Sequence, residues 1–344
     1  MRFIDLAAHG GCSKKGAATE VRDLLAAVRA ASSGKQFDSI STNFPDCGVY
    51  VVNGQTFLST VDIVLPMALS PSDFGKITVS HVLGDLYASG GLPLFALCIL
   101  GVPSGMSASS PHAVEVMTAA VEKLSSENVL LVGGHTMTEQ QDFYLGFAAV
   151  GRLIGDAPLG QTKAKPGDVL ILTKPLGTSI ATLRWKLEDA IAAEHRDVIE
   201  GMLQSNRVAS NILVASNVQT CTDVTGYGLL GHLYNILKAS SVAATIAVSR
   251  LPFYQSLAGV LNPDHSRLAI SNFDYVRPHL KRSVQLNSFQ EALLFDSQVS
   301  GGLLFCAHPN DVAKICRQLQ DAGFSPSRIG EVRDGVTGEI ELVE

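Results

Sequence analysis

The stretch Thr222–Leu233, "TDVTGYGLLGHL", is the part of the sequence that says most about the fold. Its aspartate stands at the end of a strand-like run, glycines follow, and leucines then recur at helical spacing, so we predict a strand, a tight turn and a closely packed helix. Residues 226–231 also have the G-x-G-x-x-G spacing of a dinucleotide-binding site. That site needs an acidic residue about 20 positions further on. None occurs between Asp223 and Asp264, so we reject dinucleotide binding.

The composition predicts a globular protein with more than one core. The chain has 344 residues, of which 46% are hydrophobic and 17% charged, enough for two domains. A net charge of −6 gives no electrostatic reason to expect nucleic acid or an anionic membrane as partner. The six cysteines occur singly, as in reduced cytosolic proteins. The N-terminal apolar run is too short for a signal peptide, and Leu92–Val102 is too short to cross a bilayer, so we expect a cytoplasmic protein.

The order of helical and strand-like segments predicts an α+β class with two domains. Strand-like segments dominate the first half, where Asn53-Gly54 separates two of them as a hairpin turn. Helical segments are more prominent after residues 156–168, which are rich in Pro, Gly and Lys and resemble a linker. We therefore divide the chain into a glycine-rich lead-in at 1–45, an N-terminal domain at 46–158 and a C-terminal domain at 166–344.

The N-terminal stretch His9–Gly16, "HGGCSKKG", combines a cysteine and two lysines with glycines. It has the G-x-x-x-x-G spacing that begins a P-loop, but Ala17 and Ala18 follow where Lys and Ser/Thr are required, so we reject a P-loop. The residues alone leave two interpretations open. The segment is either a mobile arm that carries a nucleophile or an exposed tail with an incidental thiol.

Four aspartates, Asp46, Asp62, Asp85 and Asp223, lie at strand ends or among apolar residues without basic residues nearby. Each alone is compatible with a helix cap or a local ion pair. Together they are better explained by a common function, because an unpaired buried carboxylate is costly and carboxylates with substrate phosphates are the usual ligands of Mg²⁺. The glycines of 132–136, "VGGHT", either present backbone N–H groups to a phosphate or only mark the turn after a strand.

The order of motifs along the chain resembles the selenophosphate synthetase (selenide, water dikinase) family. The motifs are HGGC with its lysine, PDCGV, STVD, GDLYASGGLP, VGGH, TKPLG, TDVTGYGLLGH and DSQVSGGLL. The resemblance runs from His9 to about Gly330 and extends to a superfamily that includes aminoimidazole ribonucleotide synthetase and thiamine monophosphate kinase. It implies an aminoimidazole ribonucleotide synthetase-like fold, in which the N-terminal domain forms a dimeric β-barrel and the C-terminal domain an α/β sandwich.

The resemblance also implies an activity. ATP, selenide and water would give selenophosphate, AMP and orthophosphate in a homodimer with Mg²⁺ as cofactor, and a need for K⁺ stays open. The neighbouring alternatives are a superfamily enzyme that uses ATP to phosphorylate another small molecule, and a non-catalytic nucleotide-binding paralogue.

The resemblance assigns roles residue by residue. Cys12 and Lys15 take the positions of the catalytic cysteine and lysine, and Asp46, Asp85 and Asp223 those of the Mg²⁺ ligands. The residues implied to contact ATP are Lys15, Asn43, Phe44, Pro45, Asp62, Asp85, Gly133, Gly134 and His135.

The chain departs from the family pattern at four positions. Pro45 replaces the first of two adjacent acids, and Cys47 follows the second. Lys14 stands where another cysteine is common, and His81 where asparagine is common.

Overall fold

The computed structural model describes residues 2–7, 10–11, 15–31, 45–187 and 192–344. Its α-helices are α1 (Ala18–Ala31), α2 (Pro71–Ala88), α3 (Pro111–Ser126), α4 (Thr178–Leu187), α5 (Arg196–Leu203), α6 (Arg207–Ala215), α7 (Gly228–Ser240), α8 (Arg267–Val276), α9 (Ser288–Phe295) and α10 (Pro309–Asp321). Its strands are β1 (Gly48–Val52), β2 (Gln55–Val64), β3 (Gly91–Pro103), β4 (Leu130–Glu139), β5 (Tyr144–Leu153), β6 (Val169–Leu172), β7 (Thr220–Asp223), β8 (Ala243–Ala247), β9 (Leu280–Arg282), β10 (Leu303–Ala307), β11 (Ser327–Arg333) and β12 (Ile340–Val343). None of the described helices is long and apolar enough to span a membrane.

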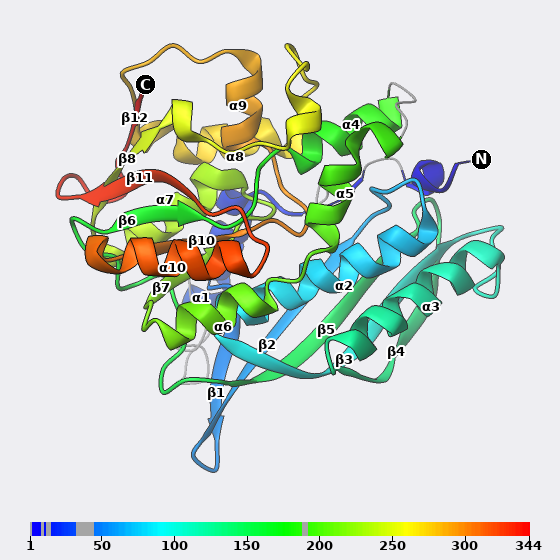
Figure 1. The fold of residues 1–344 in the computed structure, drawn as a ribbon. Coiled ribbons are helices and arrows are strands. Elements are labelled where there is room, and N and C mark those ends of the chain that lie inside the picture. The colour runs from blue at the N-terminus through cyan, green and yellow to red at the C-terminus, as the bar shows by residue number, and fades with distance from the viewer. Residues whose placement is uncertain (1, 8–9, 12–14, 32–44, 188–191) are drawn as a thin grey trace.

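The first sheet has the strand order β1-β2-β5-β3-β4. The β1–β2 hairpin turns at Asn53 (φ 52°) and Gly54 (φ 79°), the positive angles that a tight hairpin turn needs and that Asn-Gly adopts readily. Neighbouring strands are antiparallel except β3 and β4, which are parallel and joined by α3. Helices α2 and α3 lie side by side and cover one face of this sheet (Figure 1).

The second sheet has the order β7-β10-β6-β11-β8-β12-β9 and mixes antiparallel and parallel pairs. Helices α6 and α10 pack on one face, where Ile171, Phe305 and Ile315 belong to one apolar cluster. Helices α7, α8 and α9 pack together on the other side (Figure 1). The predicted α+β, two-domain aminoimidazole ribonucleotide synthetase-like fold is confirmed in its architecture.

Helix α2 connects the two halves. It begins at Pro71 with Ser70 as its N-cap, whose hydroxyl accepts a hydrogen bond from the backbone N–H of Asp73 at 3.3 Å. The helix packs on β2, β3 and β5 of the first sheet and also contacts α5, α6 and β7 of the second half. Asp85 lies near the C-terminal end of this nearly fully buried helix, so it stands where the two halves meet.

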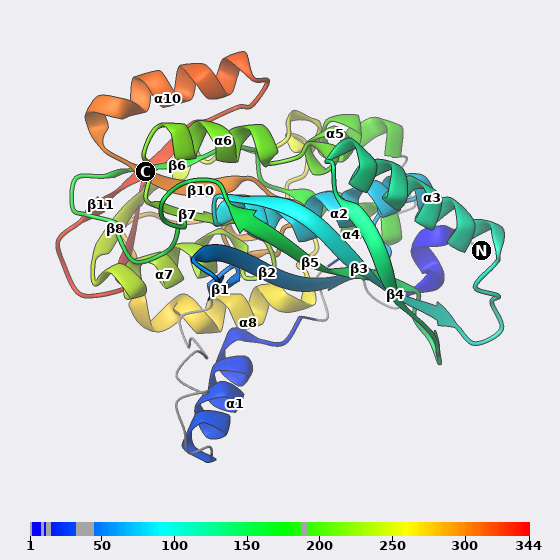
Figure 2. The same cartoon turned by 90° about the horizontal axis from the view of Figure 1, so that it is seen from below.

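The face of the first sheet opposite α2 and α3 carries exposed apolar side chains. The strand register puts one set of them on that side, and no helix of the described residues covers it (Figure 2). The exposed large side chains of this helix-free face include Tyr50, Val52, Val61, Ile63, Leu97, Leu130 and Met137. A contiguous apolar surface of this kind marks a site of protein association.

Candidate active site

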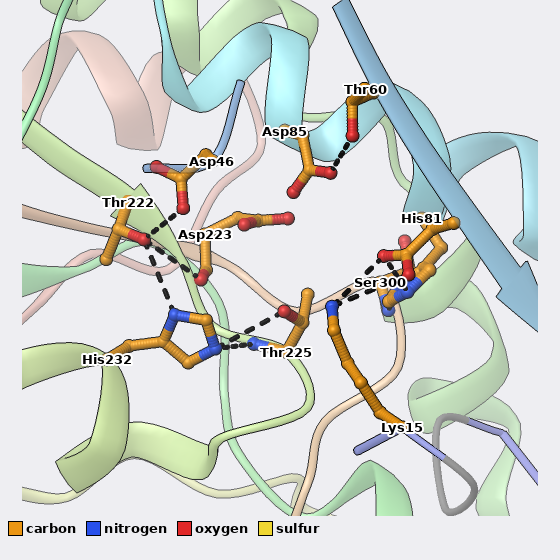
Figure 3. Close-up of polar contacts among 11 residues, drawn as sticks. Lys15, Asp46, Thr60, His81, Asp85, Thr222, Asp223, Thr225, His232 and Ser300 are labelled. Atoms are coloured by element: carbon orange, nitrogen blue, oxygen red, sulfur yellow. Dashed lines mark hydrogen bonds and ion pairs between the residues drawn. The ribbon is translucent and has the colours of Figure 1, made fainter. Parts of the chain in front are cut away.

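Three aspartates that are far apart in the sequence meet at the junction of the two halves. Asp46 lies two residues before the start of β1, Asp85 is on α2 and Asp223 ends β7. Each offers one carboxylate oxygen, and these oxygens all lie within 4.8 Å of one another (Figure 3). Asp223 is buried, and Asp46 and Asp85 are partly buried. We refer to these residues as the aspartate cluster.

Neighbouring side chains hold the cluster in place. Thr222 Oγ1 donates to Asp46 Oδ1 at 2.7 Å, and the hydroxyl of Thr60 donates to Asp85 Oδ2. Gly84 allows β7 to approach α2, because a Cβ at that position would stand only 2.6 Å from Asp223 Oδ2. Asp223 Oδ1 is buried and has no hydrogen-bond partner among the described residues. An orphaned carboxylate oxygen that faces two further carboxylates is the donor set expected for a divalent cation.

The electrostatics of the cluster favour a bound cation. Burial, followed by the charge of Asp85, raises the pKa of Asp46 to about 8. Burial, followed by the charge of Asp46, raises the pKa of Asp223 to about 7. The pKa of Asp85 is also raised well above its usual value, by burial and then by Asp223 and Asp62. At neutral pH, three carboxylates that repel one another in this way become fully ionised together only when positive charge compensates them.

A second polar group lies beside the cluster and involves Lys15, Asp62 and His81. The Lys15 ammonium is 3.4 Å from Asp62 Oδ2, and His81 Nε2 is 3.2 Å from the same oxygen. Burial alone would raise the pKa of Asp62. The charge of Lys15, with the hydrogen bond and charge of His81, outweighs it and holds that pKa below its usual range. Asp62 is therefore an ionised carboxylate that fixes the end of the Lys15 side chain.

The glycines of the N-terminal segment let it lie directly on the protein body. Gly11 forms an antiparallel bridge with Leu65, with N–H···O distances of 3.1 Å in both directions. Its φ is 60°, and a Cβ there would lie 2.7 Å from Val299 Cγ2. Lys15 Nζ is 5.8 Å from the centre of the Tyr227 ring, in the loop that follows β7. At Gly11 and Lys15 the segment is thus a docked arm rather than an exposed tail.

The structure describes only some of the other residues predicted to form the site. Cys12, Asn43 and Phe44 lie outside the described residues. Pro45 is exposed and directly precedes Asp46.

Gly133, Gly134 and His135 lie within β4, which continues to Glu139, so the interpretation of these glycines as a turn after a strand is wrong. Strand β4 is the edge strand opposite β1. The register pairs Gly133 with Leu97 and His135 with Ile99, which puts both on the helix-free face.

The sequence interpretation missed the polar residues that support Asp223. His232 on α7 accepts a hydrogen bond from the backbone N–H of Thr225 at its Nε2 (3.1 Å), and its Nδ1 lies 3.5 Å from Thr222 Oγ1. Burial lowers the pKa of His232 to about 3, so the ring is neutral and contributes hydrogen bonds rather than charge. The available signal was the run of polar side chains around Asp223, because Thr222 directly precedes it and Thr225 follows two residues later in an otherwise apolar and glycine-rich stretch.

Two family models match this chain, one over each half. The model of the AIR synthase related protein, N-terminal domain, matches residues 45–153, and that of the C-terminal domain matches residues 165–343. The selenide, water dikinase of Myxococcus xanthus is 30% identical over 99% of this chain and 97% of its own length. That of Pseudomonas straminea is 31% identical over 95% of this chain and 92% of its own. The chain belongs to the selenide, water dikinase family.

Solved structures of other proteins share the fold of this family member. Thiamine monophosphate kinase from Aquifex aeolicus superposes with a TM-score of 0.67 at 18% identity, over 94% of this chain and 96% of that one. At this level of identity the similarity establishes the fold alone. The predicted membership of the selenophosphate synthetase family is confirmed by the full-length relatives.

Proposed function

We propose that the protein synthesises selenophosphate from ATP, selenide and water, with release of AMP and orthophosphate. Family membership supports the reaction, and the observation that carries it is the convergence of the aspartate cluster with Lys15 and Asp62. Phosphoryl transfer depends mainly on charge neutralisation and on the positioning of the reacting groups. The site combines carboxylates for a cation with a lysine held in place for the phosphates.

In this proposal Asp46, Asp85 and Asp223 bind Mg²⁺, and the donor set fits the ion. The three carboxylates converge, Asp223 Oδ1 has no hydrogen-bond partner among the described residues, and carboxylates are the ligands that Mg²⁺ prefers. When bound, Mg²⁺ neutralises charge on the ATP phosphates. Thr222 and Thr60 orient the carboxylates, and the buried position of Asp223 keeps water away from its oxygens.

The remaining proposed roles belong to the N-terminal arm. Lys15 supplies a positive charge at the triphosphate, and Asp62 holds its ammonium close to the aspartate cluster. Cys12, three residues earlier in the chain, handles selenium as a thiolate, which is the nucleophilic form of cysteine. Asn43, Phe44 and Pro45 contact the nucleotide.

Product analysis by phosphorus NMR tests the function. With ATP, Mg²⁺ and selenide we expect selenophosphate, AMP and orthophosphate, and we expect none of them from Cys12→Ser or Lys15→Ala. ADP as the sole nucleotide product would instead favour a superfamily enzyme that phosphorylates another substrate. ATP binding without turnover would favour a non-catalytic paralogue. Replacement of K⁺ by Na⁺ in the same assay tests for a K⁺ requirement.

We further propose a homodimer that pairs the helix-free faces of two first sheets in a shared β-barrel. The exposed apolar side chains on that face support this arrangement, since an isolated subunit would leave them in water. Gly133 and His135 lie on the same face, with Gly134 between them in β4, and all three are distant in strand order from β1. We therefore assign their nucleotide contact to ATP bound near the interface. The unpaired cysteines of the described residues are consistent with a cytoplasmic, reducing environment.

Leu97→Asp is expected to convert the dimer to a monomer. Leu97 is 43% exposed at the centre of the helix-free face, so an aspartate there would put two carboxylates into the apolar interface. The measurement is molar mass by light scattering. Val114→Asp, at a 52% exposed site on α3, is the matched control and should stay dimeric. A dimeric Leu97→Asp protein would refute this interface.

A further inference from the structure

His81 lies one helical turn before Asp85 on α2. Its side chain is fully buried and contacts two segments that are distant in the sequence (Figure 3). Nδ1 accepts a hydrogen bond from the backbone N–H of Ser300 at 3.0 Å, and Nε2 is 3.2 Å from Asp62 Oδ2. Because Nδ1 uses its lone pair as an acceptor, the ring proton is on Nε2 and is donated to Asp62. The surroundings thus select one tautomer.

The Ser300 peptide that selects this tautomer is itself held firmly. Ser300 has a φ of 50°, a left-handed conformation that residues other than glycine adopt only where their surroundings enforce it. Its carbonyl oxygen accepts a hydrogen bond from Lys174 Nζ at 3.1 Å. Lys174 is 1% exposed and also donates to the carbonyl of Gln204 at 2.6 Å. Ser300 is therefore bonded through its N–H to the first half of the molecule and through its C=O to the second.

We propose that His81 is a positioning residue that aligns Asp62, and through it Lys15, with the aspartate cluster. The proposal rests on the proposed roles of Asp62 and Lys15. Asp62 accepts the Nε2–H of His81 and the ammonium of Lys15 on the same carboxylate. The imidazole connects this carboxylate to Ser300, so the position of the lysine is set by a peptide of the C-terminal half.

The size of the imidazole decides which of its two hydrogen bonds each substitution at position 81 would keep. An asparagine amide ends nearer to the backbone, where it can accept from the Ser300 N–H but falls short of Asp62. A glutamine amide reaches about as far as Nε2 and can donate to Asp62, but leaves the Ser300 N–H without this acceptor. The pair His81→Asn and His81→Gln therefore separates the two hydrogen bonds.

The kinetic test compares these two variants in AMP formation. We expect His81→Asn to lower kcat about tenfold with little change in the KM for ATP, since misalignment of a reacting group acts on the chemical step. His81→Gln should recover most of that loss. Wild-type kcat in His81→Asn, or a larger loss in His81→Gln, would overturn the proposal.

A spectroscopic test is independent of activity. In protein labelled with ¹⁵N-histidine, the signals absent from His81→Gln identify His81, and we expect them to show the neutral Nε2–H tautomer. The amide proton of Ser300 should exchange faster in His81→Gln than in His81→Asn or in the wild type. An Nδ1–H tautomer would refute the geometry even in a protein that makes selenophosphate. If the tautomer is as expected and no selenophosphate forms, the proposed function fails instead.

Discussion

Asp223→Asn is expected to lower the rate of selenide-dependent AMP formation about 10²–10³-fold. Asp223 is the most buried member of the aspartate cluster, and its Oδ1 has no other partner among the described residues. Asparagine keeps the shape of the side chain but removes its charge, so the cluster loses a large share of its affinity for a divalent cation. The measurement is initial rate over a range of Mg²⁺ concentrations, in which excess Mg²⁺ should restore only part of the activity.

Glu127→Gln is the matched control for this variant. Glu127 is also a buried carboxylate, but it accepts a hydrogen bond from Tyr87 at 2.8 Å and is paired with Lys123, outside the cluster. We expect its replacement to affect stability and to leave the Mg²⁺ dependence unchanged. Asp223→Asn should not lower the melting temperature of the Mg²⁺-free protein, because it relieves repulsion among three carboxylates. Full activity in Asp223→Asn would contradict the proposed metal site.

The Mg²⁺-free protein is expected to lose unfolding free energy between pH 5 and about pH 8.5, by about 1.4 kcal/mol per pH unit for each proton that only the folded state retains. The pKa of Asp46 is raised to about 8 and that of Asp223 to about 7, so the folded protein retains protons that the unfolded chain releases near pH 4. The stability linked to these protons is fully present below about pH 4 and is lost as the pH rises through those two values.

Urea unfolding at several pH values, with and without Mg²⁺, measures this effect. Mg²⁺ should raise the unfolding free energy more at pH 8 than at pH 5, because the ion binds the ionised carboxylates and competes with protons. Asp223→Asn should flatten the pH dependence of the Mg²⁺-free protein. An unfolding free energy that neither falls with pH nor responds to Mg²⁺ would refute this account of the cluster.

Local sequence patterns predicted the elements that position the site. Asn53-Gly54 identified the β1–β2 hairpin because few other dipeptides adopt its backbone angles so readily. The leucines after Gly228 identified α7. The strand-like run before them was predicted to end at Asp223, as β7 does. The suggestion that four aspartates share one function depended on the cost of burying unpaired charge, and three of them do converge.

What the sequence could not predict depends on contacts between distant segments. The bond between His81 and Ser300 joins residues 219 positions apart, and no local pattern encodes it. The glycines at 133–134 looked like the end of a strand, yet β4 continues through them. Gly134 packs so closely on β3 that a Cβ would lie 2.4 Å from the Cys98 carbonyl oxygen, so this glycine serves close strand packing.

Alternate residues of strand β2 point to the active site on one side and to the helix-free face on the other. Thr60 and Asp62 point toward α2, whereas Val61 and Ile63 belong to the helix-free face. A slip of one residue would exchange these two sets, because the side chains of a strand alternate with a period of two. Loss or gain of a single codon in this segment would therefore damage catalysis and assembly in one event. Descendants of this gene can vary β2 by substitution, but not in length.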